Sequence, residues 1–211
     1  HIIGSDPGVT AAFNGATHMP FEDGALYMTV PGAVVIDSCD YVQTKSLTKK
    51  LAEYPKLSYM RLIRKNFKTI YADGSEFEIG KGVTLKDGKD VTIIASGIML
   101  DEALRAEEIL SAEGISARVI DMHTWKPIDE ELICKAAEET GCIVTAENHQ
   151  VGCGLGSAVA NVLVANKPVP MERVGIQDRF GQVGPQDFLM KEYNLMAEDI
   201  VEAVKKVISR K

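Results

Sequence analysis

Hydrophobic and polar positions change their spacing several times over the first 63 residues. Short apolar runs of strand length alternate with segments of helical period, and the longest helical segment ends at Pro55. This pattern predicts strands at 1–4, 33–37 and 57–63, a short helix at 20–28 and a longer helix at 41–54. Strands that alternate with helices in this way predict a parallel sheet.

The pattern changes between residues 65 and 90. Asp73-Gly74 and Asp87-Gly88 are turn signals, and they surround two short strand-like runs, TIYA (69–72) and FEIGKGVTL (77–85). We therefore expect a hairpin-like connector here.

A second alternating series follows the connector. It predicts strands at 90–96, 116–122, 142–147 and 170–176, and helices at 100–113, 129–140, 155–166, 188–193 and 197–208. The sequence thus predicts an α/β fold in which a small first part precedes a doubly wound sheet with helices on both faces. The expected division is 1–66, a connector at 67–90, and 91–211.

Composition narrows the classes of function. Thirty acidic residues against 23 basic ones give a net charge of -7, and the basic residues are scattered, which argues against a nucleic-acid partner. We find neither a signal peptide nor an apolar run long enough to span a bilayer, so we expect a cytoplasmic protein. The four cysteines form no CxxC pair and lie near no histidine at ligand spacing, so we predict no metal site. Cys153 lies in a glycine loop where its thiol can react, but no base lies next to it in the sequence to activate it. Because the chain starts at His1 within a strand-like run, we expect a fragment of a longer polypeptide.

Polar side chains gather in the loop that follows the first predicted strand: Asp6, Asn14, His18, Glu22 and Asp23. Ligands bind at the carboxyl ends of strands in open parallel sheets, so His18 is a candidate for proton transfer, with Asp6 and Asn14 as partners for sugar-like hydroxyls. In the alternative reading, Thr17 caps a helix and His18 is merely exposed. Spacing alone slightly favours this second reading.

Two further features have a functional and a structural reading. Arg64 ends the third predicted strand, where its guanidinium suits a phosphate or carboxylate, although spacing alone favours a surface arginine paired with a nearby acid. The run GCGLG (152–156) lacks the glycine spacing of a dinucleotide site, so we interpret its glycines as serving a tight turn and close helix packing. His149 lies at a predicted strand end, where it can contact a ligand or partner, but we favour packing and loop hydrogen bonds as its role.

Longer motifs resemble transketolases. The loop GSDPGVTAAFNGATHMPFED (4–23) is similar to the family's loop that ends in a Thr-His pair. IDMHTWKPIDEELI (120–133), TAENHQVGCGLGSAVA (145–160) and DRFGQVG (178–184) are similar to segments of the transketolase C-terminal domain. The resemblance runs from about residue 3 to residue 208 and is strongest to the C-terminal subunit of split transketolases. It implies that 1–66 is part of a pyrimidine-binding domain and that 91–211 is the family's C-terminal domain.

This resemblance implies a role for two residues. His18 matches the family's proton-transfer histidine, and Arg64 matches its sugar-phosphate arginine. Three positions depart from the family pattern: Asp6 stands where most members have histidine, Asn14 where many have an acid, and Met28 where arginine is usual. A carboxylate at Asp6 repels a phosphate, which predicts altered substrate handling or impaired activity.

The resemblance also implies thiamine diphosphate and Mg²⁺ as cofactors of the full assembly. The residues that activate and stack on the cofactor in the family lie upstream of this chain's first residue, and the GDG signature of the metal site is absent from the sequence. We therefore expect the fragment alone to be inactive and not to bind the cofactors. The expected partners are an N-terminal subunit with the diphosphate site, a second copy through the C-terminal half, and sugar phosphates.

Two other classes remain open from the sequence. A deoxyxylulose-phosphate synthase or a 2-oxo-acid dehydrogenase β subunit shares segments such as GKDVTIIASG (88–97), although GATHMPFED and DRFGQVG favour transketolase. A non-catalytic dimerisation or regulatory domain is the alternative that the substitutions at Asp6, Asn14 and Met28 favour.

Overall fold

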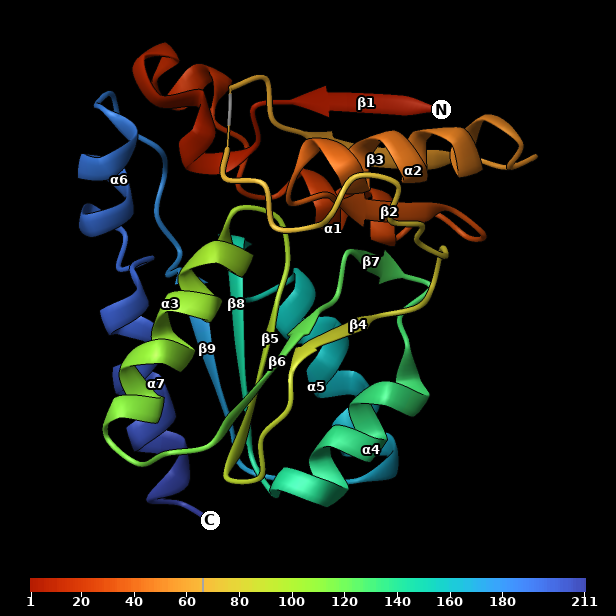
Figure 1. The fold of residues 1–211 in the computed structure, drawn as a ribbon. Helices are drawn as coiled ribbons and strands as arrows, with labels where there is room; N and C mark the ends of the chain where they lie inside the picture. Colours follow the sequence, from red (N-terminus) through yellow and green to blue (C-terminus); the bar gives the residue numbers. More distant parts are fainter. Residues whose placement is uncertain (66) are drawn as a thin grey trace.

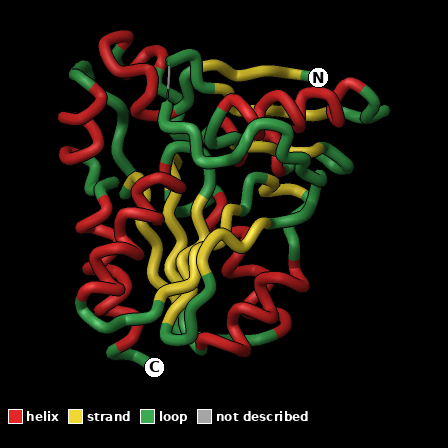
Figure 2. Tube along the Cα trace, viewed as in Figure 1, coloured by secondary structure: helices red, strands yellow, loops and turns green. Residues whose placement is uncertain are grey.

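The computed structural model describes residues 1–65 and 67–211. It contains two sheets, with strand orders β1-β3-β2-β7 and β4-β6-β5-β8-β9 (Figure 1). Helices and strands alternate along most of the chain, so the structure confirms the α/β fold class (Figure 2).

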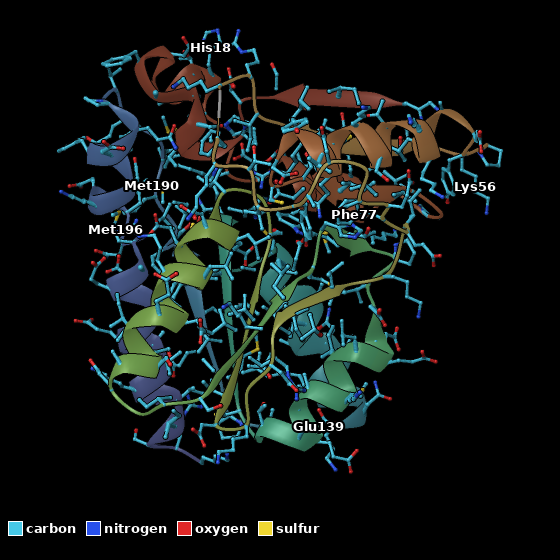
Figure 3. All side chains as sticks on the ribbon, viewed as in Figure 1. His18, Lys56, Phe77, Glu139, Met190 and Met196 are labelled. Atoms are coloured by element: carbon cyan, nitrogen blue, oxygen red, sulfur yellow. The ribbon has the colours of Figure 1, made fainter. Side chains whose placement is uncertain are left out.

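The first sheet is built from the first 62 residues and one later strand. Strands β1 (Ile2–Ser5), β3 (Ser58–Leu62) and β2 (Val34–Asp37) are parallel, and β7 (Thr124–Lys126) pairs antiparallel with β2. Three-ten turns η1 (Gly8–Asn14) and η2 (Ala16–His18) and helix α1 (Asp23–Met28) follow β1, and helix α2 (Tyr41–Ala52) follows β2. Apolar side chains of β2, β3 and α2 pack together with Phe77, which Figure 3 labels below α2.

The second sheet is doubly wound. Strands β6 (Ala117–Asp121), β5 (Val91–Ala95), β8 (Ile143–Gln150) and β9 (Met171–Ile176) are parallel, and β4 (Val83–Lys86) is antiparallel at one edge. Helices α3 (Met99–Ala112) and α7 (Ala197–Ile208) cover one face, and α4 (Glu130–Thr140) and α5 (Leu155–Asn166) cover the other, while α6 (Gln186–Glu192) packs on η1 (Figure 1). Neighbouring strand residues point to opposite faces, so Ile93 joins the core under α3 and α7 and Ile94 the core under α4 and α5.

The first sheet lies across the carboxyl edge of the second (Figure 1). Asp37 at the end of β2 accepts a hydrogen bond from Ser96 Oγ at 2.8 Å, and its backbone N–H donates to the carbonyl of His123 at 2.9 Å. The carboxyl ends of β2, β5 and β6 therefore meet between the sheets.

The predicted hairpin in the connector is wrong. Residues 69–72 form no strand, because the backbone N–H groups of Ile70 and Tyr71 donate to the Asp40 carboxylate at 2.9 and 3.0 Å instead of to a neighbouring strand. Of the second predicted run only β4 is a strand, and it pairs with β6. The division of the chain at 66–90 stays a prediction. Strand β7 comes after this division in the sequence, but it pairs into the first sheet.

The short helix after the loop also differs from the prediction. Helix α1 begins at Asp23 rather than at residue 20, and Thr17 lies in η2 and does not cap it. The carbonyl of Pro20 accepts a hydrogen bond from the Gly8 N–H at 2.9 Å, which closes the loop before the helix starts.

Candidate functional site

The loop between β1 and α1 lies at the carboxyl edge of the first sheet. Its start is tied to β3, because the Asp6 N–H donates to the Leu62 carbonyl at 2.7 Å. Asn148 of β8 holds its middle: its side-chain oxygen accepts from the Val9 N–H at 3.0 Å and its amide donates to the Pro7 carbonyl at 2.9 Å. Both sheets thus fix the shape of this loop.

Asp6 and Arg64 meet at this edge. The Asp6 carboxylate is buried and accepts from the backbone N–H of Arg64 at 3.1 Å and from Nε of its guanidinium, with Nη2 completing the ion pair. The Arg64 side chain is 62% exposed. Asp6 has a φ of 56°, a left-handed conformation that aspartate tolerates better than most residues. The structure therefore joins two of the predicted site residues, 58 positions apart, in one ion pair.

Asn14 and His18 lie on the exposed surface of the same loop. Asn14 ends η1 and His18 ends η2, and Figure 3 shows His18 at the outer end of the molecule, above the first sheet. The ring Nδ1 of His18 lies 2.9 Å from the hydroxyl of its neighbour Thr17, and this local hydrogen bond orients the ring. The roles of these residues stay predictions.

A buried arginine cluster that the sequence analysis missed lies between the sheets. Arg61 is fully buried and donates to Asp23 at 3.0 Å and to the Asn148 carbonyl at 2.9 Å, and its Nη1 lies 3.3 Å from Asp37. Its guanidinium also lies 5.2 Å from the centre of the Trp125 ring. The signal was present, since a charged residue in the apolar run LSYMRLI requires buried partners.

The two carboxylates around Arg61 respond differently to it. Burial raises the pKa of Asp23, but Arg61 and a 2.7 Å hydrogen bond from the Tyr59 hydroxyl outweigh it, so the pKa falls below its usual value. For Asp37 burial prevails over Arg61 and the pKa rises. We therefore describe the cluster as an ionised Asp23–Arg61 pair with Asp37 as a second, weaker partner.

His149 is buried, and the glycine run approaches the Glu147 carboxylate closely. Burial lowers the pKa of His149 to about 4, and the ring packs edge-on against Trp125 at 5.2 Å. The Glu147 carboxylate accepts from the N–H groups of Leu155 and Gly156 at 2.7 and 2.8 Å at the start of α5. A Cβ at Gly154 would lie 2.0 Å from that carboxylate, so the glycine is required for the approach.

The carboxyl edge of the first sheet carries a cavity but, in the described part of the chain, no metal site. A cavity of about 540 Å³ lies beyond the ends of β2 and β3, lined by residues such as Ser38, Cys39, Leu62 and Phe67. Within residues 1–65 and 67–211, no group of three or more His, Cys, Asp or Glu side chains is arranged to hold a metal ion. No helix in the described part of the chain is both long and apolar enough to cross a bilayer.

The fold and this edge define the class of protein: an α/β protein in which a small, mainly parallel sheet with a polar carboxyl edge lies on a doubly wound domain. Residues 80–200 match the family described as "Transketolase, C-terminal domain". The chain belongs to the transketolase family.

Similar proteins carry the names of transketolase subunits. The chain is 44% identical over 210 residues to the 6-deoxy-6-sulfo-D-fructose transketolase subunit of Clostridium sp. (strain MSTE9), covering 100% of this chain and 65% of the relative. It is 40% identical to a subunit of the apulose-4-phosphate transketolase of Phocaeicola vulgatus, covering 99% of this chain and 67% of that protein. A solved structure described as "Split gene transketolase, inactive beta4 tetramer" superposes with a TM-score of 0.91 at 43% identity, over 99% of this chain and 66% of that one. The chain thus spans about two thirds of the length of these proteins.

Proposed function

We propose that the chain is the C-terminal part of a transketolase, which transfers a two-carbon ketol unit between sugar phosphates with thiamine diphosphate and Mg²⁺. The observation that carries this proposal is the likeness to split transketolase subunits over 96% or more of the chain, since it includes the loop that holds Asp6, Asn14 and His18. The location that we propose for this activity is the cytoplasm, where the free cysteine thiols of the chain would stay reduced.

The described residues do not fit the metal and diphosphate of the cofactor, because they provide no cluster of metal ligands. We assign that site to a separate N-terminal subunit and expect this chain to be inactive alone. The structural relative described as an inactive tetramer of one subunit type supports this assignment. We also propose that two copies associate through the C-terminal half, residues 91–211.

Within the assembly, each site residue has a chemical task. His18 exchanges a proton with a substrate hydroxyl through Nε2, the ring nitrogen opposite the one that contacts Thr17. Arg64 binds the terminal anion of the sugar with the guanidinium edge that Asp6 does not occupy. Asn14 offers an amide to a sugar hydroxyl.

The test is a reconstitution. The chain is mixed with its N-terminal partner, thiamine diphosphate, Mg²⁺, xylulose 5-phosphate and ribose 5-phosphate, and the seven-carbon product is measured. A product with both subunits and none with either alone is expected, and no product at any ratio would sink the proposal.

His18→Ala tests the proton-transfer role in the same assembly. Loss of a general acid–base group lowers turnover by about 10²-fold or more. His1→Ala is the matched control, because His1 is exposed and its ring contacts Ser58 at the far end of β3. Unchanged turnover in His18→Ala would remove His18 from the mechanism.

A further inference from the structure

The contact between Asp6 and Arg64 changes the charge that this edge presents to a ligand. Arg64 alone would present a full positive charge to a ligand, but the buried Asp6 carboxylate binds one side of the guanidinium directly. The net charge of the pair is zero, since Asp6 carries -1 and Arg64 carries +1.

The position of Asp6 is fixed by backbone groups rather than by the Arg64 side chain. Its backbone N–H is bonded to Leu62, its φ is 56°, and Pro7 restricts the chain directly after it with a φ of -66°. Its other carboxylate oxygen holds the backbone N–H of Arg64 at 3.1 Å. The carboxylate therefore cannot swing away when an anion approaches Arg64.

The guanidinium keeps donors for a ligand. Arginine has five N–H donors, and Asp6 takes those of Nε and one side of Nη2, which leaves the Nη1 donors without a partner among the described residues on a side chain that is 62% exposed. This side of the guanidinium can bind two oxygens of a tetrahedral anion in the bidentate manner.

We propose that Asp6 is a positioning residue that sets the charge preference of this site: by orienting and neutralising Arg64, it makes the site select a singly charged terminal group, such as a sulfonate, at least as well as a phosphate dianion. The inference rests on the proposed function, because it assigns the terminal anion of the sugar to Arg64. A phosphate monoester carries close to two negative charges at neutral pH, whereas a sulfonate carries one. The additional charge meets the fixed Asp6 carboxylate and gains nothing from a neutral pair.

Methanesulfonate and methylphosphonate are matched probes, because they share a tetrahedral shape and differ in charge when the phosphonate is fully ionised at pH 9. Their affinities for the chain are measured by NMR titration of the backbone N–H signal of residue 6, which is hydrogen-bonded to the Leu62 carbonyl and is present in every variant. In the unmodified chain we expect methylphosphonate to bind no more tightly than methanesulfonate. Phosphonate binding more than about tenfold tighter would overturn the proposal, and this arm requires no variant to fold.

Asp6→Asn removes the charge and keeps the shape. We expect the affinity ratio of phosphonate to sulfonate to rise about five- to tenfold, even if a less ordered Arg64 weakens both ligands equally. Asp101→Asn is the matched control, because Asp101 lies on α3 and pairs with the exposed Lys68, and we expect it to leave the ratio unchanged. A ratio that does not change in Asp6→Asn would refute the role of Asp6.

The assembled enzyme provides a second readout. The ratio of kcat/KM for a ketose with a terminal phosphate to that for the same ketose with a terminal sulfonate should rise in Asp6→Asn, chiefly through KM. Arg64→Gln separates this inference from the proposed function: it should abolish binding of both probes, and undiminished binding would overturn the anion role of Arg64 itself. Absence of ketol transfer with the expected probe ratios would reject the proposed reaction but not the role of Asp6.

Discussion

Arg61→Met is the substitution that most directly tests how the two sheets are held together. Methionine fills much of the volume of the arginine side chain but cannot pair with Asp23 or Asp37, which lie 3.0 and 3.3 Å from the guanidinium. The Asn148 carbonyl, 2.9 Å away, loses its donor as well. The substitution therefore leaves two carboxylates and a carbonyl buried without their partner.

The expected loss is large because Arg61 is fully buried. Removing one partner of a buried ion pair costs about 3–5 kcal/mol of the free energy of unfolding, since the remaining charge stays desolvated. A protein of ordinary stability has about 5–15 kcal/mol in total. Lys167→Met is the control: Lys167 is 47% exposed and pairs with Glu138, which is 72% exposed, so we expect a loss within about 0.5 kcal/mol.

Urea denaturation followed by circular dichroism gives both free energies of unfolding by linear extrapolation. Measurement at two pH values identifies the cause. Without Arg61 the pKa values of the buried carboxylates rise, so the destabilisation is greatest above those values and shrinks as the pH falls and the carboxylates become neutral. A loss below about 1 kcal/mol, or a larger loss that is equal at pH 5 and pH 8, would refute the electrostatic reasoning.

Two further predictions concern the loop and a buried histidine. Asn148→Ala removes both side-chain hydrogen bonds to the loop, so hydrogen exchange of the Val9 amide should accelerate by about tenfold. Asn166→Ala is the control: the Asn166 side chain donates only within α5, so the exchange rate of Val9 should stay unchanged. Burial lowers the pKa of His123 from 6.5 to about 4, so its contribution to stability is present above pH 6.5 and lost as the pH falls toward 4. As the pH is lowered from 6.5 toward 4, the urea midpoint of the unmodified chain should therefore fall more steeply than that of His123→Gln. The same pH dependence in both proteins would contradict the lowered pKa of His123.

Local pattern was sufficient for elements that bury one face on a neighbour. The runs at 33–37 and 90–96 form β2 and β5, and the helical segment at 41–54 forms α2, because their apolar spacing matches the core they join. The three-residue strand β7 was missed, since it is too short for a period and exists through its pairing with β2. TIYA failed as a strand because a side chain 30 positions earlier, Asp40, takes its N–H groups.

The sequence was sufficient to select residues of the candidate site but not to predict the contacts between them. Sequence reasoning selected Asp6 and Arg64 separately, yet treated Asp6 as a repulsive group near a phosphate. Their ion pair depends on β1 and β3 being neighbours, with Ser5 beside Leu62, and this register follows from the sheet order rather than from local spacing. Arg61 and Arg64 differ by three positions, and only the packing of the second sheet decides that one is fully buried and the other exposed.

The support that β8 gives the loop has a consequence for protein engineering. Asn148 and Gln150 belong to the later part of the chain, but they hold Val9 and Phe21 of the loop that carries His18. A chimera of two transketolase subunits joined within residues 67–90 would transfer every predicted substrate residue and leave behind the side chain that shapes their loop. Recombination designs should therefore exchange the β8 terminus together with the first 64 residues, because the loop keeps its shape only when both segments match.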